Sequence, residues 1–188
     1  MRWVHAEVRK LLTLPALRVT AALTLAATVF LSWVDADPIA YTQVGFLVLG
    51  ALAATESQRT TLLAMPRRLT LHVAKLVALT AVTAPIAVVA ALPTAAATAA
   101  ATAAYLILTT QLAFGVGTLI RHPLASVLAL LASHVIAGPL LRSAYETASV
   151  YLPDTPAWRS EHGLPATVLW TVSALAISAY AFQRRDAR

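Results

Sequence analysis

LHVAKLVALTAVTAPIAVVAAL, residues Leu71–Leu92, is an apolar stretch whose only ionisable side chains stand near its start. A helix that crosses the hydrocarbon core of a bilayer needs about 20 consecutive apolar residues, and this stretch is long enough. The whole chain has the same character: of its 188 residues, 59% are hydrophobic and 12% are charged, and the mean hydropathy is +0.74. These values predict a membrane protein.

The apolar residues of the chain gather in six runs, of which the second is the shortest. The runs are Leu14–Val34, Ile39–Thr55, Leu71–Leu92, Ala95–Ile120, Leu124–Leu141 and Leu164–Phe182. We therefore predict an all-α fold, with one six-helix transmembrane domain over residues 14–188. The first run is full length and five more follow it, so it is interpreted as a retained helix and not as a cleaved signal peptide.

The basic residues lie on alternate connections. If successive connections lie on opposite sides of the membrane, one side holds all of the 14 basic residues except Arg142 and Arg159. Cytoplasmic connections of membrane proteins are rich in Lys and Arg, so both termini are expected in the cytoplasm. The net charge of +6 is thus interpreted as a signal for topology and for anionic headgroups, and no nucleic-acid partner is expected.

Two segments outside the six runs also carry information. Residues 1–13 place Val4, Val8 and Leu11 on one helical face with basic residues largely opposite, which predicts an interfacial helix on the inner leaflet. A basic flank that only orients the first span explains this segment equally well. The outer loop, residues 142–163, is rich in aromatic residues and prolines, so we expect it to lie at the outer interface or to dip into it as short re-entrant helices.

Motifs that carry chemistry are missing from the sequence. It contains no phosphate-binding loop, no Gly-rich nucleotide fingerprint, no G-x-S-x-G turn and no H-E-x-x-H helix. It also contains no cysteine. We therefore expect neither an enzyme nor a bound cofactor or metal in this chain. Its Ala-, Thr- and Arg-rich, Lys-poor composition is typical of GC-rich bacterial genomes, which favours a bacterial cell membrane.

His134 is the one ionisable residue placed well inside a run. A charged side chain at that depth costs a few kcal/mol, so a neutral, hydrogen-bonded histidine is expected. Helix packing is favoured over lining of a polar pathway, and a haem or proton-relay role is remote. Gln43 and Gln111 are similar candidates for a polar path or for helix packing.

The connection TESQRTTLLAMPRR, Thr55–Arg68, raises a separate question. Its arginines are explained as positive-inside anchors, but its acid, short polar segment and Met65-Pro66 are not. In their order, Glu56, Arg59, Thr60–Leu63, Pro66–Arg68 and Lys75 resemble ABC-2 type permeases, the membrane subunits of bacterial ABC exporters. The resemblance extends over nearly the whole chain. It also includes Glu7–Leu11, Arg121-His122, Tyr151–Pro153 and Arg184–Asp186. Ser57 stands where the family usually has an aromatic residue, and the family's glycine is missing.

The resemblance implies a mechanism. Two six-helix subunits, identical or related, would surround a central path, and each would dock on a separate cytoplasmic ATPase that holds ATP and Mg. The interfacial helix and the connection after the second span would receive the movement of the ATPase. The residues implied in this coupling are Glu7, Arg9, Lys10, Glu56, Arg59, Arg67, Arg68 and Lys75. The substrate cannot be read, since a peptide, a small drug or a lipid would all suit an apolar path.

Two other classes of function compete with export. A membrane scaffold or immunity-type binding protein would need no ATPase and would move nothing. An intramembrane enzyme would need a catalytic constellation, and the sequence offers none. Loss of transport on deletion of the chain separates the exporter from the scaffold.

Overall fold

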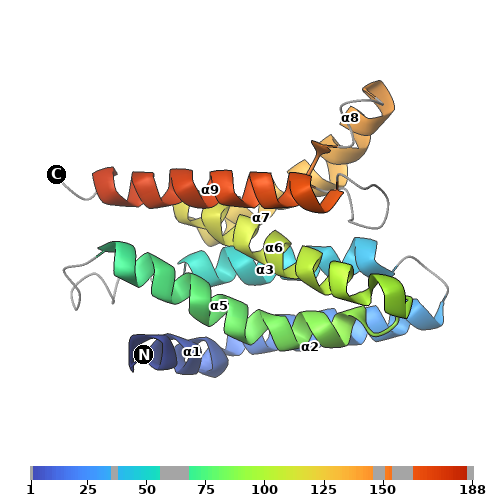
Figure 1. The fold of residues 1–188 in the computed structure, drawn as a ribbon, viewed down its shortest axis with the longest axis horizontal. Helices are drawn as coiled ribbons and strands as arrows, with labels where there is room; N and C mark the ends of the chain where they lie inside the picture. Colours follow the sequence, from blue (N-terminus) through green and yellow to red (C-terminus); the bar gives the residue numbers. More distant parts are fainter. Residues whose placement is uncertain (1, 35–37, 56–67, 146–150, 154–162, 186–188) are drawn as a thin grey trace.

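A computed structural model describes residues 2–34, 38–55, 68–145, 151–153 and 163–185, and the elements formed by these residues are all helices (Figure 1). In chain order they are α1 (Arg2–Thr13), α2 (Pro15–Trp33), α3 (Pro38–Thr55), α5 (Arg68–Ala91), α6 (Ala96–Ile120), α7 (Pro123–Leu131), the π-helix η1 (Ala132–Ala137), α8 (Gly138–Ala144) and α9 (Gly163–Arg185). The all-α prediction is confirmed, and every predicted run contains a helix.

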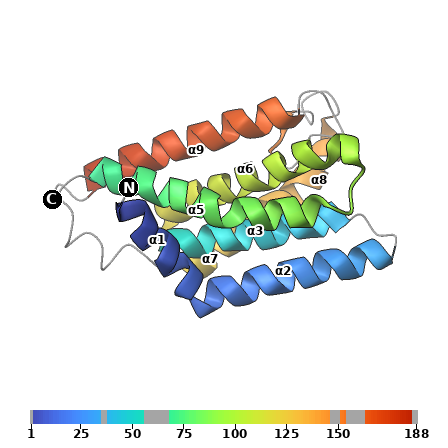
Figure 2. The same ribbon diagram turned by 60° about the horizontal axis from the view of Figure 1, so that its bottom comes forward.

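The long helices lie side by side along the longest axis of the molecule (Figures 1 and 2). Both chain termini and the turn between α6 and α7 lie at one end, which is called the terminal end below. The α2–α3 and α5–α6 links lie at the opposite, distal end. Successive connections therefore alternate between the two ends of the bundle.

Five of the helical segments are long and apolar enough to cross a membrane: Pro15–Trp33, Thr70–Ala91, Ala97–Ile120, Pro123–Ala144 and Gly163–Gln183. The segment Ile39–Thr55 of α3 is apolar but shorter. Large apolar side chains such as Leu23, Phe30, Leu128 and Ile177 point outward and are more than half exposed. An apolar exterior of this extent fits a multi-pass membrane protein, because lipid takes the place of water around it.

Helices α3 and α6 form the centre of the bundle, and small residues allow their close approach. A Cβ atom added at Gly117 would lie 2.7 Å from the Cβ of Ala54, and one added at Gly50 would lie 2.7 Å from the Cβ of Ala113. Both distances are below van der Waals contact, so only glycine fits at these two positions. Small residues at a helix interface bring the backbones close together, which is the common way of packing helices in a bilayer.

Four buried threonines form hydrogen bonds within their own helices. The hydroxyls of Thr28, Thr83, Thr109 and Thr110 each donate to the carbonyl four residues earlier, at 2.8–2.9 Å. This local bond removes the cost of an unpaired hydroxyl in an apolar interior. Threonine therefore serves here as a small packing residue.

The fifth predicted run is one continuous helical stretch that widens into a π-helix at η1. Pro139 has no N–H, and its ring would clash with the carbonyl of Val135 in a regular α-helix. The Gly138 N–H instead bonds to the Ser133 carbonyl, five residues earlier. Beyond η1, α8 turns away from the direction of α9 (Figure 1) and continues to Ala144, past the expected end at Leu141.

Candidate functional site

Helix α1 is held against the bundle by its apolar face. Leu11 is buried in a cluster with Ala53, Leu79 and Phe114, and Val4 and Val8 are partly buried against it, while His5 and Arg9 are exposed. Leu14 is extended, with φ −70° and ψ 115°, and Pro15 begins α2 directly after it. The short elbow leaves α1 on α5 at the terminal end (Figure 2).

The polar residues of α1 and α5 come together beneath α1. Glu7, Lys10 and Lys75 line one small cavity together with apolar side chains that include Leu11 and Phe114. Glu7 and Lys75 are each only 8% exposed. A buried charge costs several kcal/mol unless an opposite charge or hydrogen bonds compensate it. Glu7 and Lys75 line the same cavity, so the Glu7 carboxylate is the opposite charge that stands next to the Lys75 ammonium group.

His72 lies one turn before Lys75 and is also buried. Its ring centroid is 5.5 Å from that of Phe114 on α6 and 6.1 Å from that of Phe182 on α9. Its Nε2 lies 3.4 Å from the hydroxyl of Ser178 on α9. His72, with these two rings and this hydroxyl, therefore joins α5, α6 and α9. We call Glu7, Lys10, His72, Lys75 and Ser178 together the terminal cluster.

The turn between α6 and α7 lies at the same end as the terminal cluster. Arg121 caps α6 in the left-handed conformation, with φ 59°, and its N–H bonds to the Gly117 carbonyl at 2.9 Å. His122 is the N-cap of α7, where its Nδ1 accepts from the Ala125 N–H, and Pro123 occupies the first helical position. The sequence R-H-P thus makes a tight reversal and keeps the exposed Arg121 at the terminal end.

The structure tests the placement of only some residues of the implied coupling set. It brings Glu7, Lys10 and Lys75 together and leaves Arg9 exposed on α1. Arg68 begins α5 at the terminal end. Glu56, Arg59 and Arg67 lie outside the described residues, as does most of the predicted outer loop.

The three residues considered for a polar path face different neighbours. Gln43 accepts a 2.6 Å hydrogen bond from the Tyr105 hydroxyl, and Gln111 donates to the Leu76 carbonyl and the Thr80 hydroxyl. The His134 Nδ1 lies 3.2 Å from the Leu130 carbonyl and 3.1 Å from the Ser133 hydroxyl. Each of the three residues therefore forms hydrogen bonds with a different set of neighbours.

A groove of about 260 Å³ lies on the side of the bundle next to His134. Leu112 and Val116 of α6, Leu141 of α8 and Trp170 of α9 contribute its apolar lining. The Trp170 indole N–H donates to the Tyr151 carbonyl at 2.9 Å, which fixes residues 151–153 to α9. His134 is 5% exposed, and with Ser133 it forms a polar spot in a mostly apolar wall.

Sequence reasoning missed His72 and Ser178, because it treated His72 as a residue near a span end. A signal was present: His72, Lys75 and Leu79 follow a spacing of three and four residues, which places them on one helical face. A face that carries two basic groups next to leucine predicts a polar contact within the protein, since such groups are not left facing lipid.

Comparison of the chain with protein-family models, with curated proteins and with solved structures found no match. In the ranges that the structure describes, no group of three His, Asp or Glu side chains is placed to hold a metal ion. The terminal cluster therefore rests on its own geometry: polar side chains of α1, α5 and α9 gather at the end of the bundle that carries both termini.

Proposed function

We propose that this chain is the membrane subunit of an ABC-2 type exporter, coupled at its terminal end to a separate cytoplasmic ATPase. The observation that carries the proposal is the burial of Glu7 and Lys75 between α1 and α5, in a cavity that the half-buried Lys10 also lines. A helix joined to a span in this way transmits force, because sliding α1 over α5 would separate or expose buried charges.

The connection between α3 and α5 supports the same role. It leaves α3 at Thr55 and enters α5 at Arg68, at the end where α1 is docked. A partner that pushes on α1 and on this connection transmits force to α5 through both of these segments. The acidic and basic residues 56–68 would let a charged partner surface find one register.

The proposal includes six spans with both termini in the cytoplasm. Helix α3 has 18 residues, which at 1.5 Å per residue gives about 27 Å, close to the thickness of a hydrocarbon core. It is packed among α2, α6 and α7, so it needs no long lipid-facing surface of its own. The basic residues at the terminal end support the cytoplasmic side for that end.

The transport path is proposed to lie between two subunits. The centre of a single subunit is closely packed where α3 meets α6 at Gly50 and Gly117. An outer wall that carries a groove next to His134 offers surface for a path shared with a second permease. ATP and Mg would be held by the partner ATPase, and this chain would supply the coupling and the path.

The first experiment expresses this chain with an ABC-type ATPase that co-purifies with it and measures ATP hydrolysis in vesicles. Glu56→Ala and Arg67→Ala should each lower the stimulated rate several-fold while the chain still inserts. Arg159→Ala, which removes the same type of charge from the predicted outer loop, is the matched control.

Two results would contradict the proposal. Hydrolysis that remains at the wild-type rate in both loop variants would remove the connection from the coupling. Failure of any ATPase to co-purify, with transport intact after deletion of the chain, would favour the membrane scaffold.

A further inference from the structure

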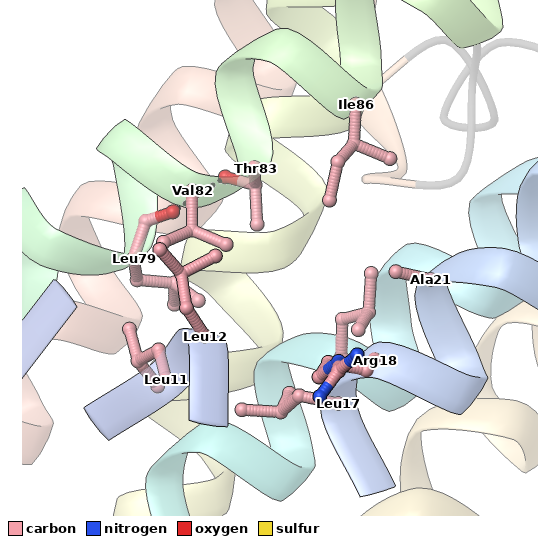
Figure 3. A pocket seen from close by; sticks show the side chains of 10 residues that line it. Leu11, Leu12, Leu17, Arg18, Ala21, Leu79, Val82, Thr83 and Ile86 are labelled. Atoms are coloured by element: carbon pink, nitrogen blue, oxygen red, sulfur yellow. Dashed lines mark hydrogen bonds between the residues drawn. The ribbon is translucent and has the colours of Figure 1, made fainter. Parts of the chain in front are cut away.

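A second pocket lies where α1, α2 and α5 meet (Figure 3), next to the terminal cluster. Its volume is about 70 Å³, and leucine, valine and isoleucine side chains, among them Leu17, Val82 and Ile86, make up most of its wall. The Thr83 hydroxyl is satisfied, since it donates to the Leu79 carbonyl at 2.8 Å. The interior of the pocket thus offers almost no polar contact.

Arg18 is the one charged side chain that lines this pocket (Figure 3). It is exposed and stands in the first turn of α2, close to the elbow that follows α1. The only acidic residue in the described ranges is Glu7, which lies in the cavity with Lys10 and Lys75. No acceptor for the Arg18 guanidinium occurs within the described part of the chain.

The order of these groups matches the order of groups in a phospholipid. Arg18 stands in the first turn of α2, and Ala21 follows three residues later, about one helical turn farther from the terminal end, while Ile86 of α5 lines the same pocket. A guanidinium binds a phosphate through paired hydrogen bonds, and an apolar slot directly below it accepts the methylenes that follow. The pocket is smaller than the engineered cavity of about 150 Å³ that holds benzene, so it suits a short piece of one chain.

We propose that this pocket binds an anionic phospholipid of the leaflet at the terminal end, with its phosphate on Arg18 and part of one acyl chain between α2 and α5. The bound lipid would lie beside α1. The proposal requires that the chain lie in a bilayer, and it does not depend on whether an ATPase is the partner.

Native mass spectrometry tests the site on the full chain. The protein is reconstituted in vesicles that contain phosphatidylglycerol and phosphatidylcholine with the same acyl chains, and is then extracted in detergent. The wild type should retain phosphatidylglycerol about fivefold more than phosphatidylcholine, since one basic residue near the surface contributes about that factor. Arg18→Gln should abolish this preference, and Arg9→Gln, which changes an exposed arginine of α1 outside the pocket, should keep it.

Ala21→Phe tests the apolar half of the site. It fills the slot and should lower retention of both lipids, while Arg18→Gln, a change at an exposed residue, keeps the fold intact. Equal phosphatidylglycerol retention in Arg18→Gln and Arg9→Gln would overturn the proposal. The attraction for anionic lipid would then come from all the basic residues of the terminal end and not from Arg18. Unchanged lipid retention with an altered subunit number in Ala21→Phe would overturn it too, by assigning the slot to a second copy.

Discussion

At the scale of single residues, two pairs of polar side chains inside the bundle form hydrogen bonds between helices. Tyr105 is fully buried, and its hydroxyl reaches the Gln43 side chain on another helix at 2.6 Å, while the Thr28 and Thr42 hydroxyls lie 2.6 Å apart. In an apolar interior such a bond is stabilising chiefly because the unpaired alternative is costly. This pairing favours helix packing over a pathway as the role of Gln43.

Tyr105→Phe should therefore lower the free energy of unfolding by about 1–2 kcal/mol, because it leaves the Gln43 amide oxygen without its donor. The measurement is unfolding by denaturing detergent in mixed micelles. The double variant Gln43→Leu, Tyr105→Phe should recover part of the loss, since both polar partners are then removed. A pathway role would give a different result, with altered transport and unchanged stability.

At the scale of helices, α6 packs more closely against α3 than against α9. Gly50 and Gly117 leave no room for a methyl group between α3 and α6. A Cβ added at Gly115 would lie 3.1–3.3 Å from atoms of Ala174 on α9, so that a small shift of α9 would accommodate it. The rigid pair of helices is thus α3–α6, and α9 packs against it with more tolerance.

Gly50→Ala and Gly117→Ala should each destabilise the protein by about 2 kcal/mol through overpacking. Helix propensity alone predicts the opposite sign, because alanine is favoured over glycine in a helix interior by about 1 kcal/mol. Gly115→Ala is the matched control and should change the melting temperature in detergent much less. A rise in melting temperature for Gly50→Ala would show that α3 and α6 are less close than described here.

The arrangement of the helices also explains how much of the candidate site could be predicted from the sequence. The apolar face of α1 and the basic residues near the start of α5 follow from periodicity and charge. The burial of Glu7 against Lys75, and of His72 between Phe114 and Phe182, could not be read. Which side of a span faces its neighbours depends on the rotation of each helix, which packing sets and which local sequence in a uniformly apolar run does not.

At the scale of the whole molecule, the two ends of the bundle differ in charge and in what they carry. The terminal end holds both termini, α1 and the R-H-P turn. We propose that this end faces the cytoplasm, where it would meet both a partner ATPase and the anionic headgroups of the inner leaflet.

The chain contains no cysteine, so a single introduced cysteine can report this orientation without first replacing native cysteines. Arg59→Cys, in the connection between α3 and α5, should react with a membrane-impermeant maleimide only after the cells are permeabilised. Ser160→Cys, in the predicted outer loop, should react in intact cells. Labelling of Arg59→Cys in intact cells would reverse the orientation and would remove the basis for docking an ATPase at this end.

The sequence by itself determined that the protein is all-helical, where along the chain its long helices lie, and that its connections alternate in charge. These properties are local, because they depend on runs of apolar residues, on prolines at helix starts and on the basic residues between runs. Only the tertiary structure decided that α3 and α6 form the centre, that charges are buried beneath α1 and that Arg18 stands over an apolar slot. Those features depend on how far apart helices lie and how each is rotated, which are set by side chains that are distant in sequence and fit together in space.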